Sequence, residues 1–169
     1  MYDKANTHFN AYGSFISCST LINEIRKDFP QLPELSLDDY EIEIQNIQKD
    51  ELTRMLNITR NDTHIALTKK GKVHGKLIPS NIEHNSPNPN YIKHYTSNLN
   101  NVKVILFGDS FTGPMAFFLK ECFGDLIRIR SSSIDEELVE LIKPDIIIQE
   151  VVERNIDHLF LGKYHVPKI

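Results

Sequence analysis

The sequence predicts an α/β fold in which a mainly parallel sheet is covered by helices on both faces, as a three-layer sandwich. In the C-terminal third, apolar segments that suit buried strands alternate with amphipathic segments that suit helices. The order strand, helix, strand, helix, strand is typical of parallel strands joined by crossover helices. With 169 residues, 40% of them hydrophobic and 25% charged, we expect one globular domain that spans residues 1–169.

The N-terminal part is predicted to contain two helices and a strand. Residues 11–29 carry apolar side chains at helical spacing, and Pro30 ends this helix. The run YEIEIQNI, within residues 37–47, alternates apolar and polar residues like a strand with one wet face. Residues 50–56 suit a short helix. Residues 59–101 are polar, and we expect loops there with one or two edge strands.

The C-terminal elements have recognisable start and stop signals. Pro114 suits the first turn of a helix, and Thr112 is a candidate cap for it. Ser133 is a candidate cap for the next helix, which the pair Lys143-Pro144 ends. The expected elements are strands at residues 102–107, 126–130 and 145–152, and helices that end at Phe123 and Ile142.

Composition argues against several classes of function. The formal net charge is −4 with no cluster of Lys and Arg, so nothing favours nucleic acid as a partner. No apolar run approaches the roughly 20 residues that cross a bilayer. Cys18 and Cys122 lie in apolar stripes of separate predicted helices, and we expect buried free thiols. The histidines that recur every ten residues from His64 to His94 match no ligand spacing, so we expect no metal and no cofactor.

Ser110 follows the predicted strand that ends at Phe107, within the sequence GDS. In parallel sheets, ligands bind at the carboxyl ends of strands, where helix N-termini present unpaired N–H groups. A hydroxyl held there could attack an acyl carbonyl while N–H groups stabilise the oxyanion. However, Thr112 replaces the second glycine of the G-x-S-x-G nucleophile elbow. GDS by itself is therefore compatible both with a nucleophile and with a simple turn.

A nucleophilic serine needs a general base, and the base needs a partner that orients it. Two histidines follow a polar residue by two positions: His8 follows Asn6, and His64 follows Asp62. Asp62 offers a charge, whereas His8 stands directly before the first predicted helix. The residues alone leave both histidines as candidates.

Four blocks follow one another along the chain: YDKANTHFNAYGSF at the start, ELTRMLNI at 51–58, GDSF around Ser110 and KPDIIIQEVVER at 143–154. They resemble the blocks Y-x-K-T-D-T-H-W-N-x-x-G-A, D-L-A-x-M-L-G, G-D-S-F and K-P-D-x-V-I-x-E-x-x-E-R of the SGNH-like acetyltransferases related to the alginate O-acetylation proteins AlgJ and AlgX. The resemblance implies an SGNH-hydrolase-like fold. It also implies that Ser110 takes an acetyl group, that His8 shuttles its proton, and that position 6 orients the imidazole.

In that family the reaction is acyl transfer or ester hydrolysis on extracytoplasmic polysaccharide. The resemblance therefore implies a polysaccharide or acetylated sugar as substrate and a membrane acetyl-donor protein as a partner. It also implies a periplasmic or extracellular location, with a signal that is not in this chain. The strands that precede the first block in the family have no counterpart here, as expected of an N-terminally truncated chain or of half a site completed elsewhere.

The chain departs from the family at position 6, where Asn6 replaces an aspartate. An amide can accept a hydrogen bond from Nδ1, but it cannot stabilise an imidazolium by charge. In serine proteases this exchange costs on the order of 10⁴ in kcat. From the sequence we therefore expect Asn6→Asp to raise turnover, unless Asp3 or Asp62 supplies the missing charge.

Two alternatives to an enzyme follow from these observations. Asn6 favours a catalytically impaired module that binds a glycan or a partner enzyme in the same cleft. The run GDSFTG could instead bind phosphate in a flavodoxin-like nucleotide binder, because hydroxyl and N–H groups at a helix N-terminus suit an anion.

Overall fold

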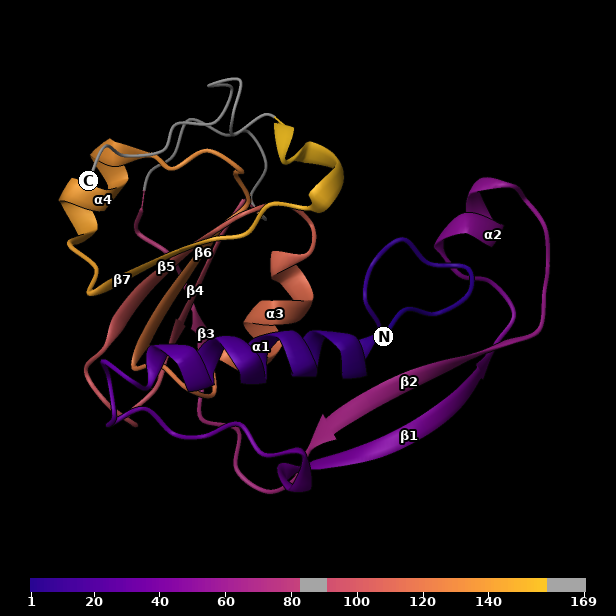
Figure 1. Cartoon of the computed structure of the whole chain (residues 1–169), viewed down its shortest axis with the longest axis horizontal. Helices are drawn as coiled ribbons and strands as arrows, with labels where there is room; N and C mark the ends of the chain where they lie inside the picture. Colours follow the sequence, from indigo (N-terminus) through magenta and orange to yellow (C-terminus); the bar gives the residue numbers. More distant parts are fainter. Residues whose placement is uncertain (83–90, 158–169) are drawn as a thin grey trace. The chain divides into compact units, whose positions relative to one another are not determined.

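The computed structural model describes residues 1–82 and 91–157 (Figure 1). The chain divides into two compact units, residues 1–73 and the part from His74 onward, and each is described here by itself. A single domain over residues 1–169 stays a prediction. Both helices and strands are present, which confirms the α/β class.

The first unit begins with helix α1, Ala11–Ile25. The side chain of Asn10 caps it by accepting a hydrogen bond from the N–H of Gly13 at 2.9 Å. Its apolar stripe buries Phe15, Cys18 and Ile22, which is the face that the helical spacing predicts. The helix is confirmed, although it ends earlier than predicted because a turn precedes Pro30.

A two-stranded antiparallel ribbon completes the first unit. The short 3-10 helix η1, Leu37–Asp39, leads into β1, Tyr40–Ile47, which pairs with β2, Asp62–Lys69. The helix α2, Glu51–Met55, lies between the two strands in the sequence, as predicted. The strand β2 agrees with the expectation of an edge strand after residue 59. Its bounds were not predicted, because its alternation runs through Thr and His rather than strongly apolar residues.

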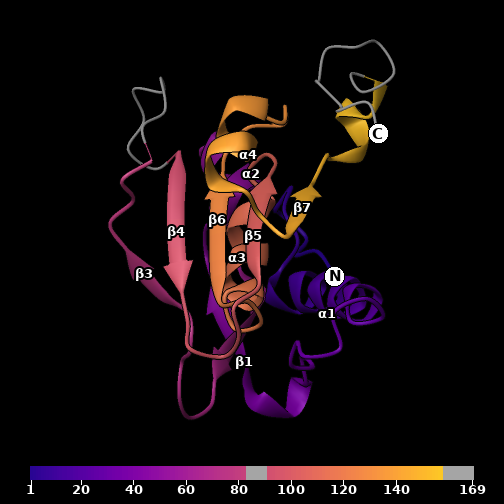
Figure 2. The ribbon, with the colours of Figure 1, turned by 90° about the vertical axis from the view of Figure 1, so that its left-hand side faces the viewer.

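The second unit contains a five-stranded mixed sheet in the order β3-β4-β6-β5-β7 (Figure 2). Its strand β5 pairs in parallel with β6 and with β7, whereas β4 pairs antiparallel with both β3 and β6. The parallel arrangement thus holds for the three predicted C-terminal strands only. The strands are β3, Lys76–Ile78; β4, Ile92–Thr96; β5, Lys103–Phe107; β6, Asp125–Ile129; and β7, Ile146–Gln149.

The position of β4 corrects the expectation of an edge strand in the polar region. It lies inside the sheet between β3 and β6. The sequence of β4, IKHYT, is half polar, but its main chain pairs over its full length with β6, from Ile92 to Thr96. His94 is accommodated there because its Nε2 lies 2.5 Å from Oδ1 of Asp125. Main-chain hydrogen bonds to β6, rather than a pattern of apolar side chains, therefore account for this strand.

Two helices cover the parallel strands, α3, Thr112–Leu119, and α4, Glu136–Ile142. Figure 2 shows α4 in front of the sheet and α3 behind it. Helix α3 begins at Thr112 itself, earlier than predicted, and ends at Leu119 rather than at Phe123, whereas α4 begins later than predicted and ends at Ile142 as predicted. Phe111 is the N-cap of α3 and makes no side-chain cap bond, and Asp135 rather than Ser133 caps α4. A last 3-10 turn, η2, Glu153–Asn155, follows β7.

One core cluster of the second unit lies on the α4 face of β5 and β6. It is built from Ile105, Phe107, Ile127, Ile129, Ile134 and Leu138. Both cysteines are buried and free, as predicted. Within residues 1–82 and 91–157, no helix is long and apolar enough to cross a membrane.

Candidate functional site

Ser110 lies in the turn that joins the carboxyl end of β5 to α3. The carboxylate of Asp109 accepts a hydrogen bond from the N–H of Phe111 at 2.9 Å, and the hydroxyl of Thr112 donates to the carbonyl of Asp109 at 2.7 Å. The N–H of Gly113 donates to the carbonyl of Ser110 at 3.2 Å, and Ser110 is half-buried. These bonds hold the serine at the start of α3, where the sequence predicted it.

Gly108 allows this turn to pack against β7 and α3. A Cβ at this position would lie 2.5 Å from Cγ2 of Thr112 and 2.8 Å from Oε2 of Glu150. Its φ of +157° also disfavours a side chain. Glycine before the Asp-Ser pair is therefore required by close packing.

Arg128 reaches the same turn from β6. Its Nε donates to Oγ1 of Thr112 at 2.8 Å. Burial is the main cause that lowers the pKa of the Arg128 guanidinium. The hydroxyl of Thr112 is therefore fixed between Arg128 and the carbonyl of Asp109, rather than capping α3 as the sequence suggested.

Glu150 contacts this turn, and the sequence alone did not single it out. It directly follows β7, and its N–H donates to the carbonyl of Phe107 at 2.8 Å. Its Oε2 accepts a hydrogen bond from the N–H of Asp109 at 3.2 Å. Burial, followed by the negative charge of Asp109, raises the pKa of Glu150 to about 7, against a smaller opposing effect of Arg154. Glu150 corresponds to the first glutamate of the block K-P-D-x-V-I-x-E-x-x-E-R, but from the sequence this block predicted only a strand.

Glu150→Gln is expected to raise the melting temperature relative to wild type at and above pH 7. Because folding raises the pKa of Glu150, its contribution to stability is fully present below pH 4.5 and is lost as the pH rises through about 7. Glutamine can still accept the bond from Asp109 but carries no charge. The advantage of the variant in thermal scans should grow between these pH values. The exposed Glu140→Gln is the control, and a pH-independent difference at position 150 would contradict this assignment.

His8 lies in the first unit, beside the start of α2. Its Nδ1 is 3.2 Å from Oε2 of Glu51 and 3.4 Å from the hydroxyl of Thr7. Thr7 donates to the same oxygen of Glu51 from its N–H, at 3.0 Å, and from its hydroxyl. A carboxylate therefore contacts the ring nitrogen of His8 that a triad acid would contact. Glu51 is the second residue that the sequence reasoning did not single out.

Asn6 makes different contacts from those expected of an orienting group. Its Oδ1 accepts a hydrogen bond from the main-chain N–H of His8 at 3.0 Å, and its Nδ2 donates to Oδ1 of Asp50 at 2.7 Å. The amide thus shapes the chain around His8 and ties it to the residue that caps α2. The sequence predicted a bond from Asn6 to Nδ1 of the ring, but these contacts go to the main chain of His8 and to Asp50, and Glu51 contacts Nδ1.

The other two acids considered for this role have their own partners. Asp3 contacts Nδ1 of His64 at 2.5 Å through one oxygen and accepts from Nδ2 of Asn10 at 3.1 Å through the other. Asp62 accepts from the N–H of Thr63 at 2.9 Å. Asp3 therefore pairs with the rival histidine.

No candidate metal site emerges from the side chains in the described part of the chain, since no three His, Cys, Asp or Glu residues gather there. His64 and His94 lie on strands, and each contacts one aspartate. His84 lies outside the described residues.

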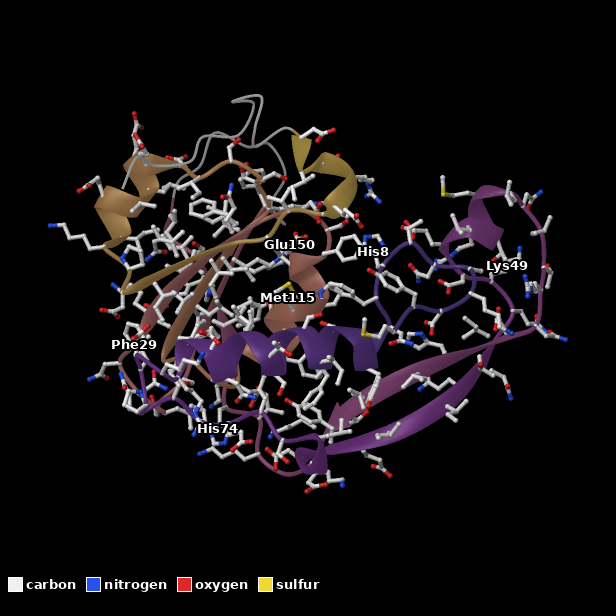
Figure 3. All side chains as sticks on the ribbon, viewed as in Figure 1. His8, Phe29, Lys49, His74, Met115 and Glu150 are labelled. Atoms are coloured by element: carbon white, nitrogen blue, oxygen red, sulfur yellow. The ribbon has the colours of Figure 1, made fainter. Side chains whose placement is uncertain are left out.

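Ser110 belongs to the second unit, and His8 and Asn6 belong to the first. Figure 3 labels His8 in the loop before α1, and Glu150 just beyond β7. The catalytic roles of Ser110, His8 and Asn6 therefore stay predictions.

Comparison with known proteins shows a related fold. No family profile and no curated protein sequence matches the chain. Two structures of Bacillus cereus PatB1 match 92% of it, one with a TM-score of 0.67 at 14% identity and one, with a sulfonyl adduct, with 0.70 at 16%. A DHHW family protein from Eubacterium siraeum matches 99% of it, with a TM-score of 0.68 at 11% identity. The chain covers 63%, 61% and 65% of these three structures, respectively.

Proposed function

We propose that this protein carries out serine-dependent acyl transfer to, or acetyl ester hydrolysis on, an extracytoplasmic polysaccharide. The observation that carries the proposal is the placement of Ser110 in a turn fastened by hydrogen bonds between the carboxyl end of β5 and α3. The fold shared with PatB1 and the four blocks that resemble SGNH-like acetyltransferases support it.

In the proposed reaction, Oγ of Ser110 attacks the acyl carbon and its proton passes to Nε2 of His8. N–H groups of the serine turn stabilise the oxyanion. The intermediate collapses to an acyl-serine, and the departing oxygen of the donor takes the proton from His8. A sugar hydroxyl or water then gives its proton to His8 and attacks the acyl-serine. The acyl group leaves on that oxygen, as the acetylated sugar or as acetic acid, and Oγ of Ser110 takes back the proton from His8.

The sulfonyl adduct in one of the PatB1 structures suggests a direct probe. Sulfonyl electrophiles react with activated nucleophilic side chains. We expect a sulfonyl fluoride or a fluorophosphonate to label this protein, and peptide mass spectrometry to place the label on Ser110. An unlabelled protein would favour the glycan-binding module, and flavin that co-purifies would favour the flavodoxin-like alternative.

The partners and location belong to the same proposal. A polysaccharide or acetylated sugar is the proposed substrate, a membrane protein is the proposed acetyl donor, and the periplasm or cell exterior is the proposed location. The support for all three is the resemblance of the sequence blocks to that family.

An impaired binding module is the second candidate, and Asn6 is the observation that favours it. The contact of Glu51 with Nδ1 of His8 weighs against it, because a carboxylate there can replace the charge that Asn6 lacks.

Asn6→Asp is now expected to lower stability and to leave turnover no higher, in contrast to the expectation from sequence alone. The substitution removes the donor to Asp50 and places a second carboxylate against it, where Nδ2 and Oδ1 are now 2.7 Å apart. Loss of this bond beside the buried Asp50 should cost about 1–3 kcal/mol of unfolding free energy. Urea unfolding and p-nitrophenyl acetate turnover measure both effects.

The exposed Asn61→Asp adds the same charge to the same unit and serves as the control. Faster turnover by the Asn6→Asp variant would restore the sequence-based interpretation of position 6.

A further inference from the structure

A single carboxylate oxygen in the first unit contacts three polar groups of the loop that carries His8. Oε2 of Glu51 accepts from the N–H of Thr7 at 3.0 Å and from its hydroxyl, and it lies 3.2 Å from Nδ1 of His8. Its side chain is 34% exposed and that of His8 is 26% exposed, so the pair is partly shielded from water.

The surroundings keep Glu51 charged. Hydrogen bonds from the side chain and then the main chain of Thr7 are the largest causes that lower the pKa of Glu51, and His8 lowers it further. An ionised carboxylate offers only acceptors, so Nδ1 of His8 must carry the proton in their contact. The hydroxyl of Thr7 lies 3.4 Å from Nδ1 and donates its proton to Glu51, so towards the ring it can act only as an acceptor.

The main chain holds Glu51 in this place. The N–H of Leu52 donates to the carbonyl of Ala5 at 2.9 Å, and Asn6 donates to Asp50 at 2.7 Å. Asp50 in turn caps α2 in a capping box with Thr53. The start of α2 is thus fastened on both sides of Glu51 to the loop of residues 5–8, which limits how far the carboxylate can move from His8.

We propose that Glu51 is the positioning residue for His8: it holds the imidazole with Nδ1 protonated, so that Nε2 carries no proton and can accept one. This inference rests on the proposed function for its catalytic consequence, although the contact itself does not. Glu51 supplies the negative charge that stabilises the imidazolium once His8 has taken a proton. Asn6 keeps the main chain of His8 in place.

The contact of Glu51 with His8 accounts for the asparagine at position 6, because Glu51 supplies the charge that Asn6 lacks. In a triad the acid performs two tasks, selecting the tautomer and stabilising the imidazolium, and an amide can perform only the first. Here the carboxylate comes from a residue 43 positions further along the chain. The chain therefore keeps an acidic partner for His8 despite the loss of aspartate at position 6.

The test compares Glu51→Gln with wild type by ¹⁵N NMR of the imidazoles at about pH 8.5, where histidines are ordinarily neutral. We expect wild-type His8 to show the Nδ1-protonated tautomer, assigned by the loss of its signals in His8→Ala. Glutamine at position 51 can donate to Nδ1 and should shift His8 towards the other tautomer. The same variant should lower kcat for p-nitrophenyl acetate by between about 10²- and 10⁴-fold. Glu41→Gln, at an exposed site on β1, should change neither measurement.

The outcomes separate this inference from the proposed function. Wild-type His8 protonated at Nε2 overturns the inference without any need for a variant. A tautomer that is the same in wild type and in folded Glu51→Gln overturns it without any need for activity. A tautomer shift combined with serine labelling that neither Glu51→Gln nor His8→Ala affects would support the positioning role and reject His8 as the base of Ser110. Thr7→Val, which removes a hydroxyl and keeps the carboxylate, should retain the wild-type tautomer.

Discussion

Ser110→Ala is expected to abolish covalent labelling by a fluorophosphonate and to lower acetyl ester turnover on the order of 10⁴- to 10⁶-fold. The acyl-serine cannot form without Oγ, and what remains is the activity that binding and oxyanion stabilisation alone provide. The turn should keep its shape, because the N–H of Gly113 and the hydroxyl of Thr112 donate to the main-chain carbonyls of residues 110 and 109. Labelling followed by mass spectrometry, together with steady-state turnover of p-nitrophenyl acetate, measures the effect.

Ser132→Ala is the matched control. Ser132 is a half-buried serine in the same unit, and its carbonyl, rather than its hydroxyl, accepts a hydrogen bond from Gln149 at 2.7 Å. It should label and turn over like wild type. If Ser110→Ala retained labelling or most of its turnover, the nucleophile would lie elsewhere and the proposed mechanism would fail.

Phe107→Ala is expected to reduce the free energy of unfolding by about 3–5 kcal/mol. Phe107 is fully buried at the end of β5, in the core cluster that includes Ile129 and Leu138. Truncation removes apolar contacts and leaves a cavity that the paired strands β5, β6 and β7 can close only in part. Urea unfolding followed by circular dichroism measures the change.

Phe117→Ala provides the comparison for the same change of side chain. The ring of Phe117 is 42% exposed on α3, and it packs edge-on against Phe118 with the centroids 5.0 Å apart. Its loss should cost about 1 kcal/mol. Equal losses at positions 107 and 117 would mean that the β5 face is not the core of this unit.

Residues of or next to the two strands that flank β5 hold the serine turn by hydrogen bonds. Glu150 accepts from the N–H of Asp109 from beyond β7, while Arg128 donates to Thr112 from β6. Both strands flank β5 in parallel, so the carboxyl ends of all three meet at the turn that carries Ser110. This arrangement agrees with the general placement of ligand sites in parallel sheets, and it holds for this half of the sheet although the whole sheet is mixed.

Local sequence signals predicted the elements that have strong periodicity. The apolar stripe of α1 and the apolar strands β5 and β6 were identified because each buries an apolar face. The strand β1 was identified by its alternation alone, since Ile42 and Ile44 are exposed, and β7 by its apolar run. The strands β2, β3 and β4 were predicted only as one or two edge strands without bounds, and β4 lies inside its sheet. Their polar composition hides the pattern, and antiparallel pairing with distant segments stabilises them.

The sequence also indicated Ser110 and His8 as the residues with the required chemistry, but it could not indicate their partners. Glu51 stands among ordinary helix-starting residues, and Glu150 stands at the end of an apolar strand. Neither position has a local pattern that marks a contact with residue 8 or residue 109. Those contacts join segments that are 43 and 41 residues apart.

By itself, the sequence determined the α/β class, the strand-turn-helix around Ser110 and the histidine before α1, since these depend on neighbouring residues. The tertiary structure alone decided the mixed sheet and which acid meets each histidine: Glu51 for His8 and Asp3 for His64. The physical reason is that a hydrogen bond or ion pair acts over about 3 Å in space, whatever the separation along the chain.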